Sequence, residues 1–444
     1  MRAQRTRLGS LASALVAALM TGGILVTALD SQDGPHRAGV GSMGTPAAET
    51  AGVGTPAASL ALPPPVKQSI SATPLPTPWT APTVVSYVVP GLASFPSSAD
   101  GWVLGEGCDL RGDCETAVAR TTDGGAGWTL VSPPVIPSSA GYGLQLLAAS
   151  AGDAWVWGTD AEGSSVFSAT HDGGRSWQPI DIGSMVVGDL ALGEGTVWAM
   201  AGCPAGGSAC PDHLLSSPAT GGAWTDLGPL PISMEVQPVT SVFLPGPELV
   251  RSGSRTWVLA AYPPGSTPAL LRSDDGGSSW TSLPLPCQAA MRPLAMAAAS
   301  VDDLLLVCGT SGAWPAPQEI WASQDGGGTW LLRSREFATV FSPSLRDVGS
   351  IGSQGLPNEV LMVSAGTAWI WGDREQDLVS HDGGVTWTAP SLPYGGGGGA
   401  DGLTFSDPLH GWTFGSDGLW VTTDGGVTWR SEPIIGPVPG SLTS

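Results

Sequence analysis

The chain has 444 residues, of which only 12% are charged, and its formal net charge is −21. A surface this acidic repels phosphate backbones and anionic lipid headgroups, which argues against nucleic acid as a partner and leaves solvation or a cationic ligand as the role of the charge. The 64 glycines and 19 tryptophans indicate strands, tight turns and large apolar anchors.

Residues 1–29 have the pattern of an export segment, because a basic stretch precedes an almost uncharged apolar run of 22 residues from Leu8 to Leu29. The sequence Val26-Thr-Ala28 offers a signal-peptide cleavage site, whereas the length of the run also suits an uncleaved N-terminal membrane anchor. In both cases the remainder of the chain is extracytoplasmic. We expect it to be secreted, or anchored through residues 8–29 on the outer face of the cytoplasmic membrane.

Residues 30–83 are rich in Ala, Pro, Thr, Ser and Gly and show no sustained apolar alternation. Such a segment cannot bury a core, so we interpret it as a disordered linker. Residues 84–434 carry a repeated motif, and residues 435–444 form a flexible tail.

The motif consists of Ser or Thr followed by X-Asp-Gly-Gly-X-X-Trp, and it first occurs at residues 121–128. Aspartate and hydroxyl side chains bond backbone groups in a tight hairpin, glycine adopts the positive φ of the turn, and the tryptophan covers it. The motif is therefore a structural staple. Six copies are intact and a seventh has Ala219 in the acidic position but keeps its tryptophan: Asp123 and Trp128, Asp172 and Trp177, Trp224, Asp275 and Trp280, Asp325 and Trp330, Asp382 and Trp387, Asp424 and Trp429.

Successive motif tryptophans are 42 to 57 residues apart, close to the ~40–50 residues of a four-stranded propeller blade. A second marker, as in Gly101-Trp102-Val-Leu-Gly105, precedes each motif, and the fifth unit has Leu304-Leu-Leu-Val in its place. Each of the two markers therefore indicates seven units. We predict an all-β fold, a single seven-bladed β-propeller at residues 84–434, in which each blade runs through strands A to D and the motif joins C to D.

With these motifs the chain resembles the Asp-box, or BNR, repeat propellers, which include sialidases and the photosystem II stability and assembly factors. The resemblance implies that the box lies on the rim away from the binding face, so it marks no active site. Partners would then bind the face that carries the D-to-A and B-to-C loops, where length varies most.

The six cysteines predict disulfides in an exported chain, and fifteen pairings are possible in principle. Proximity within the predicted blades favours three of them: Cys108 with Cys114, Cys203 with Cys210, and Cys287 with Cys308. Clustered thiolates could instead bind a metal, but no Cys-X-X-Cys spacing occurs. We expect no metal and no cofactor, with calcium at the acidic loop 373–377 as the open alternative.

A sialidase-type active site needs converging arginines, a tyrosine nucleophile with a carboxylate behind it, and an acid. The Phe/Tyr-Arg-Ile-Pro signature of that family is missing near the first blade, and Met291-Arg292-Pro293 in the fifth unit is only a fragment. The strand A segments are poor in arginine, which predicts a polar, arginine-poor mouth at the propeller axis. We assign no catalytic residue.

We therefore expect a monomeric, non-catalytic binding or scaffold propeller that recognises a protein or a glycan, and keep a glycoside hydrolase of the sialidase superfamily as the alternative. The candidate binding residues are arginines and aromatic side chains of the loop face, which are typical interface anchors. They are Arg111, Tyr142, Tyr262, Trp314, Arg333, Arg335, Arg346, Arg374 and Tyr394.

Overall fold

The chain divides into two compact units, Met1–Thr55 and Pro56–Ser444, and every described residue belongs to the second. No helix capable of spanning a bilayer is found among the described residues, and residues 8–29 lie outside them. The computed structural model describes the backbone of residues 59–61, 69–70 and 349–350, and residues 85–111, 113–136, 143–160, 164–203, 211–232, 248–260, 267–288, 291–310, 318–335, 357–372, 377–390, 392, 402–415 and 418–434.

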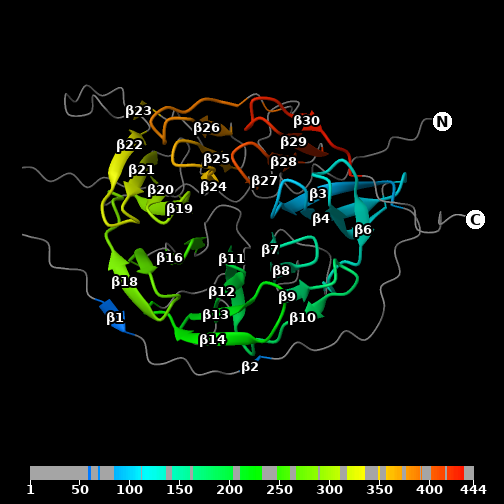
Figure 1. The fold of residues 1–444 in the computed structure, drawn as a ribbon, viewed down its shortest axis with the longest axis horizontal. Coiled ribbons are helices and arrows are strands. Elements are labelled where there is room, and N and C mark those ends of the chain that lie inside the picture. Colours follow the sequence, from blue (N-terminus) through cyan, green and yellow to red (C-terminus); the bar gives the residue numbers. More distant parts are fainter. Residues whose placement is uncertain are drawn as a thin grey trace, which may run out of the picture. The chain divides into compact units, whose positions relative to one another are not determined.

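The described part of the second unit is an all-β, seven-bladed propeller, as predicted (Figure 1). Each blade is an antiparallel meander of consecutive strands, with strand A innermost and strand D outermost. Blades 1 to 3 consist of β3 (Tyr87–Ser94), β4 (Gly101–Cys108), β5 (Cys114–Thr121) and β6 (Thr129–Val131); β7 (Gly143–Ala148), β8 (Ala154–Thr159), β9 (Ser165–Thr170) and β10 (Gln178–Pro179); and β11 (Val186–Gly193), β12 (Thr196–Gly202), β13 (His213–Pro218) and β14 (Trp224–Pro229).

Blades 4 to 7 follow the same order, except that the described residues of blade 6 form three strands, with an isolated bridge between Val379 and Thr388 where strand D would begin. They consist of β15 (Glu248–Ser252), β16 (Arg255–Ala260), β17 (Ala269–Ser273) and β18 (Ser279–Leu283); β19 (Arg292–Ala298), β20 (Asp303–Gly309), β21 (Gln318–Gln324) and β22 (Leu331–Arg335); β24 (Pro357–Met362), β25 (Ala368–Gly372) and β26 (Leu378–Ser380); and β27 (Gly402–Phe405), β28 (Gly411–Gly415), β29 (Gly418–Thr422) and β30 (Arg430–Ser431).

Three short strands extend the outer edges of blades. β1 (Ser59–Ala61) pairs with β18 of blade 4 and β2 (Ser69–Ile70) pairs with β14 of blade 3, both antiparallel. β23 (Gly349–Ser350) runs parallel to β22 of blade 5. Five residues of the segment interpreted as a linker are therefore strands, because the exposed backbone groups of an outer strand accept a further pairing partner.

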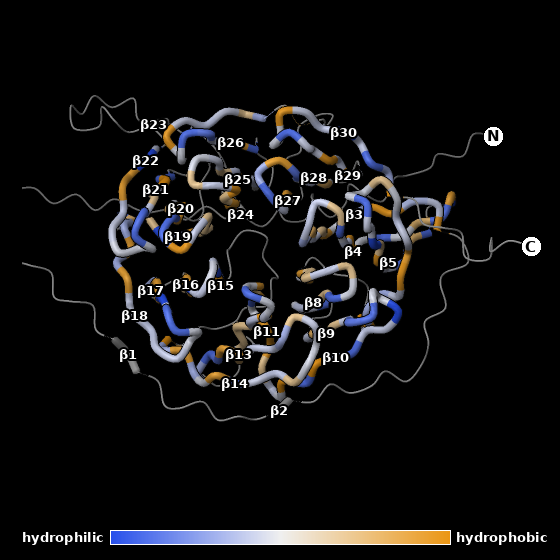
Figure 2. Tube along the Cα trace, in the orientation of Figure 1, coloured by the Kyte–Doolittle hydropathy of each residue, from blue (hydrophilic) through white to orange (hydrophobic). Residues whose placement is uncertain are grey.

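The described apolar core lies between blades and consists of seven clusters, each of which joins two neighbouring blades. In Figure 2 apolar positions follow the strands and hydrophilic ones gather in the turns. The strand B tryptophans dominate these clusters, as Trp102 and Trp257 illustrate with no exposed surface. Since burying a large side chain contributes about 1.5–3 kcal/mol, the interfaces between blades carry most of the hydrophobic stabilisation.

The ring closes between blade 7 and blade 1 through side-chain packing. The indole of Trp412 stacks on the ring of Phe95, with centroids 3.8 Å apart, and its Nε1 donates to the carbonyl of Gly124 at 3.1 Å. The N–H of Val88 donates to the carbonyl of Ile434 at 3.0 Å, which ties the end of the described chain to the innermost strand of blade 1. No strand of one end completes the sheet of the other within the described residues.

The Asp boxes form the predicted staples at the C–D hairpins. In the first box the Thr121 hydroxyl donates to Asp123 Oδ1 at 2.8 Å, and the same oxygen accepts the N–H of Gly127 at 2.8 Å. Gly124 has a φ of 75°, where a side chain would be strained. In the last box, hydrogen bonds from the hydroxyl and the N–H of Thr428 lower the pKa of Asp424 to about 2.

The cysteines pair as their spacing predicts wherever both partners are described. Disulfides join Cys108 to Cys114 and Cys287 to Cys308. Cys203 is also disulfide-bonded, while Cys210 lies outside the described residues. None of the described cysteines is free.

Candidate functional site

Most of the predicted binding residues fall outside the described part of the chain: Tyr142, Tyr262, Trp314, Arg346, Arg374 and Tyr394. Arg111 is described and exposed, in the loop between strands B and C of blade 1. Its backbone N–H donates to Asp109 Oδ1 at 2.7 Å, and the Cys108–Cys114 disulfide closes the base of this loop. Arg111 is thus presented to solvent on a short, braced turn.

Arg335 lies at the loop-face end of strand D in blade 5 and is occupied by an internal partner. Its Nη2 donates to Glu319 Oε1, and the Glu319 side chain is only 1% exposed. The same carboxylate accepts hydrogen bonds from Gln288 Nε2 at 2.8 Å and from Trp321 Nε1 at 3.1 Å. Three donors satisfy this buried charge, so the cluster braces blade 5 and leaves Arg335 only partly available to a partner.

Arg333 lies closer to the Asp-box face than the sequence interpretation placed it. Its Nε donates to the carbonyl of Gly383, in the Asp box of blade 6, at 2.9 Å. The reason is its register, since it is two residues nearer the C–D hairpin than Arg335 and reaches across to the neighbouring blade. Arg333 therefore joins two blades.

The centre of the ring carries a group of side chains that the sequence interpretation missed, the axial carboxylates Asp189, Glu248 and Glu359. They belong to β11, β15 and β24, the innermost strands of blades 3, 4 and 6. Asp189 Oδ2 accepts the N–H of Leu249 at 2.7 Å, and Glu248 Oε2 accepts that of Met296 at 2.7 Å. Each of these two carboxylates thus bonds the innermost strand of the following blade.

The axial carboxylates are near the mouth that faces the D-to-A loops. Glu248 is the first residue of β15 and Glu359 the third residue of β24, and both strands are entered from those loops. Asp189 is level with them because it bonds Leu249. As a residue, Glu359 is exposed.

Electrostatics shows that the three carboxylates share one region. Burial, together with repulsion from Glu359, raises the pKa of Asp189 to about 7, although two backbone N–H groups oppose the shift. Burial raises the pKa of Glu248 well above its ordinary value, and repulsion from Asp189 and Glu359 adds to it. Burial by the surrounding protein raises the pKa of the Glu359 carboxyl to about 7, although the residue as a whole is exposed. Carboxylates of blades 3, 4 and 6 can repel one another only if they all face the propeller axis, so we place all three there.

This mouth carries three carboxyl groups with raised pKa values, so its negative charge increases as the pH rises. An anionic sugar would be repelled once the carboxylates ionise. Many described arginines have contacts within or between blades, as when Arg120 Nη1 donates to the carbonyl of Ala151 at 2.7 Å and Arg251 lies 4.2 Å above the Trp198 ring. Arg292 begins β19, as expected, at the head of an inner strand.

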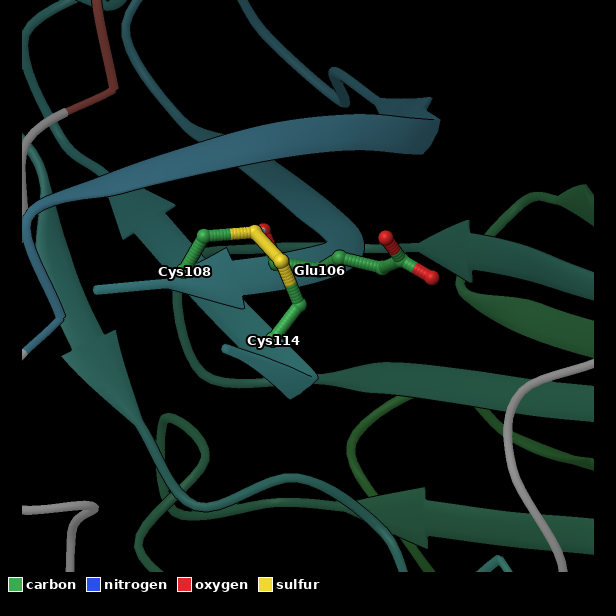
Figure 3. A group of neighbouring side chains, drawn as sticks. All are labelled: Glu106, Cys108 and Cys114. Atoms are coloured by element: carbon green, nitrogen blue, oxygen red, sulfur yellow. Dashed lines mark hydrogen bonds between the residues drawn. A yellow bond between two sulfur atoms is a disulfide. The ribbon is translucent and has the colours of Figure 1, made fainter. Parts of the chain in front are cut away.

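One group of described side chains has its ligand atoms close enough together to hold a metal ion: Glu106, Cys108 and Cys114 (Figure 3). The two sulfur atoms are joined in a disulfide, so neither is a thiolate that could bind a metal. The Glu106 carboxylate points away from the disulfide in Figure 3. This group is therefore a braced turn.

No family model matches the chain, and no curated protein is detectably similar in sequence. Among solved structures the chain is similar to YCF48 bound to D1 peptide, with 18% identity and a TM-score of 0.46 over 80% of this chain and 99% of that one. It is similar to YCF48 from Cyanidioschyzon merolae at 15% identity and a TM-score of 0.45, again over 80% and 99%.

The chain is also similar to the β-propeller domain of the Trilobed protease from Pyrococcus furiosus, at 9% identity and a TM-score of 0.47 over 82% of this chain and 100% of that one. Identity at this level carries no information about a shared function.

Proposed function

We propose that the chain is an exported, non-catalytic binding propeller of the Asp-box type that recognises a positively charged segment of a protein at the mouth facing its D-to-A and B-to-C loops. One observation carries the proposal: carboxylates from three blades converge at the axis near this mouth, where they repel one another. A Lys or Arg side chain entering the mouth relieves that repulsion. Its binding therefore lowers the pKa values of the carboxylates and is favoured above neutral pH.

Two features support binding over hydrolysis. Asp189 and Glu248 each use a carboxylate oxygen to hold the innermost strand of the next blade, which fixes them as parts of the scaffold. Arg335, an arginine of the loop-face end, pairs with Glu319. A site that clamps an anionic sugar requires the opposite arrangement, with free guanidinium groups directed at the mouth.

The alternative, a glycoside hydrolase, is favoured by one specific observation. Such enzymes need one carboxyl group that stays protonated near neutral pH, and Glu248 and Asp189 both have raised pKa values. A neutral glycan would not be repelled by protonated carboxyl groups. Turnover of neutral glycosides that is lost on changing Glu248 to Gln would establish this alternative.

The test compares the full-length protein with two variants of equal charge. The axial variant carries Asp189→Asn, Glu248→Gln and Glu359→Gln. The surface control carries Glu194→Gln, Asp274→Asn and Asp302→Asn, three exposed carboxylates of A–B hairpins and a C–D hairpin on the other face.

A displayed library of random 15-residue peptides, a glycan array and fluorogenic sialosides and neutral glycosides are presented to each protein. We expect Lys- or Arg-containing peptides to be enriched on the wild type and the surface control, to be lost on the axial variant, and all glycosides to stay intact. Selection of glycans with no charged peptide, or hydrolysis of any glycoside, would overturn the proposal.

A further inference from the structure

Blade 5 lacks the indole that the other six blades place at one equivalent position of strand B. In blade 6, Trp369 pairs with Val379, the residue that precedes the Asp-box Ser380. In blade 5, Leu305 pairs with Ala322, the residue that precedes the Asp-box Ser323. Leu305 therefore occupies the tryptophan position. The tryptophans of the other six blades are Trp102, Trp155, Trp198, Trp257, Trp369 and Trp412.

Two of the indoles at this position form a hydrogen bond with the Asp box of the following blade. Trp257 Nε1 donates to the carbonyl of Gly326 at 3.0 Å, and Trp412 Nε1 donates to that of Gly124 at 3.1 Å. Both acceptors are the first glycine after the box aspartate, and the corresponding residue of blade 6 is Gly383. Arg333 Nε donates to the Gly383 carbonyl instead, so a guanidinium replaces the hydrogen bond but not the ring.

A cavity of about 150 Å³ lies between blade 5 and the Asp box of blade 6, where this ring is missing. Its floor and walls include Leu304, Leu305 and Met362, which are buried, and its rim includes Leu331, which is 61% exposed. Trp330, Arg333 and Gly383 also line it. Asp303, Ser323, Gln324 and Thr329 line it as well, so the cavity combines an apolar floor with polar walls that include one cation.

We propose that this cavity binds a small aromatic ring up to the size of an indole. A cavity of ~150 Å³ is large enough for benzene, its floor at Leu304, Leu305 and Met362 is apolar, and an aromatic ring is the group that fills the same place in the six other blades. Inside, the ring would contact Leu305 and Met362, while the Arg333 guanidinium offers a cation–π partner. The site lies by the Asp boxes, at the opposite ends of the strands from the axial carboxylates, and does not depend on the proposed function.

Indole is titrated into the full-length protein by calorimetry and in thermal unfolding followed by circular dichroism. We expect one site per chain and a rise in Tm of at least about 2 °C at saturation. N-Acetyltryptophanamide is titrated in parallel, because binding of this larger probe identifies a protein side chain as the physiological source, whereas binding of indole alone identifies a free aromatic compound.

The decisive variant is Leu305→Trp, which restores the missing ring. We expect it to unfold at a higher Tm than the wild type and to bind indole at least tenfold more weakly. Leu331→Ser, at the exposed rim, leaves the fold intact and should weaken indole binding severalfold, so the proposal stays testable if Leu305→Trp does not fold. Wild-type protein that binds no indole, or binding unaffected by Leu331→Ser and by a folded Leu305→Trp, would overturn it.

Discussion

Replacing Trp412 by alanine should destabilise the whole propeller, because this side chain closes the ring. Trp412 is only 1% exposed, and it provides both the stack on Phe95 and the hydrogen bond to Gly124. Truncating a buried tryptophan to alanine lowers the free energy of unfolding by about 3–5 kcal/mol. This range already includes most of the energy of the stacking contact with Phe95. We expect a loss of about 4 kcal/mol, a large fraction of the ~5–15 kcal/mol that a typical protein has.

Equilibrium unfolding in urea, followed by far-ultraviolet circular dichroism, measures this loss. Leu409→Ala serves as the control, because Leu409 lies in a turn of the same blade and is 54% exposed; its midpoint should stay close to that of the wild type. A loss below about 1 kcal/mol for Trp412→Ala would show that the packing of blade 7 against blade 1 does not close the ring.

Three further predictions concern charge, the staples and the disulfides. The folded-state pKa of Asp189 is raised to about 7. The contribution of this carboxyl group to stability is therefore complete below its unfolded-state pKa of about 4 and is lost as the pH rises through about 7. The Tm of the wild type should fall between these two pH values, and Asp189→Asn should make that fall smaller. Asp172→Ala removes bonds to the hydroxyl and N–H of Ser176 and to the Thr170 hydroxyl and should cost about 1–2 kcal/mol in urea unfolding; no loss would mean that the box is not a staple. Replacing Cys287 and Cys308 by serine opens a loop of sequence separation 21 and should lower the free energy of unfolding by about 3 kcal/mol. Calorimetry of the double variant measures this loss, and an unchanged free energy of unfolding would refute the prediction.

The fold could be predicted because its signals are local and repeated. Each Asp box needs only eight consecutive residues to form its hairpin, and the strand B tryptophan reports a second position of the same blade. Blade 3 keeps its place although Ala219 replaces the acid, because Trp224 remains buried in the core between blades 2 and 3. The three strands described for blade 6 were not predicted, because its Asp box and Trp387 are regular, whereas the residues described after Trp387 form a single bridge.

The site was harder to predict because its members are far apart in sequence. Asp189 is a single acid in a short apolar strand, which gives a signal for an unusual inner-strand position but no indication of its partners. Glu248 and Glu359 join it only because the ring brings blades 3, 4 and 6 to one axis. The position of Arg333 was hard to predict for a related reason, since its side chain crosses to the carbonyl of Gly383 in the neighbouring blade, 50 residues further along the chain.

The affinity of a library-selected cationic peptide for three proteins tests the proposed function most directly. Wild type, axial variant and surface control are titrated by calorimetry at low and high salt and at pH values on both sides of 7. We predict affinity that rises with pH, weakens with salt and falls at least tenfold in the axial variant alone. Equal affinity for the axial variant and the surface control would contradict the proposal that the axial carboxylates form the binding site.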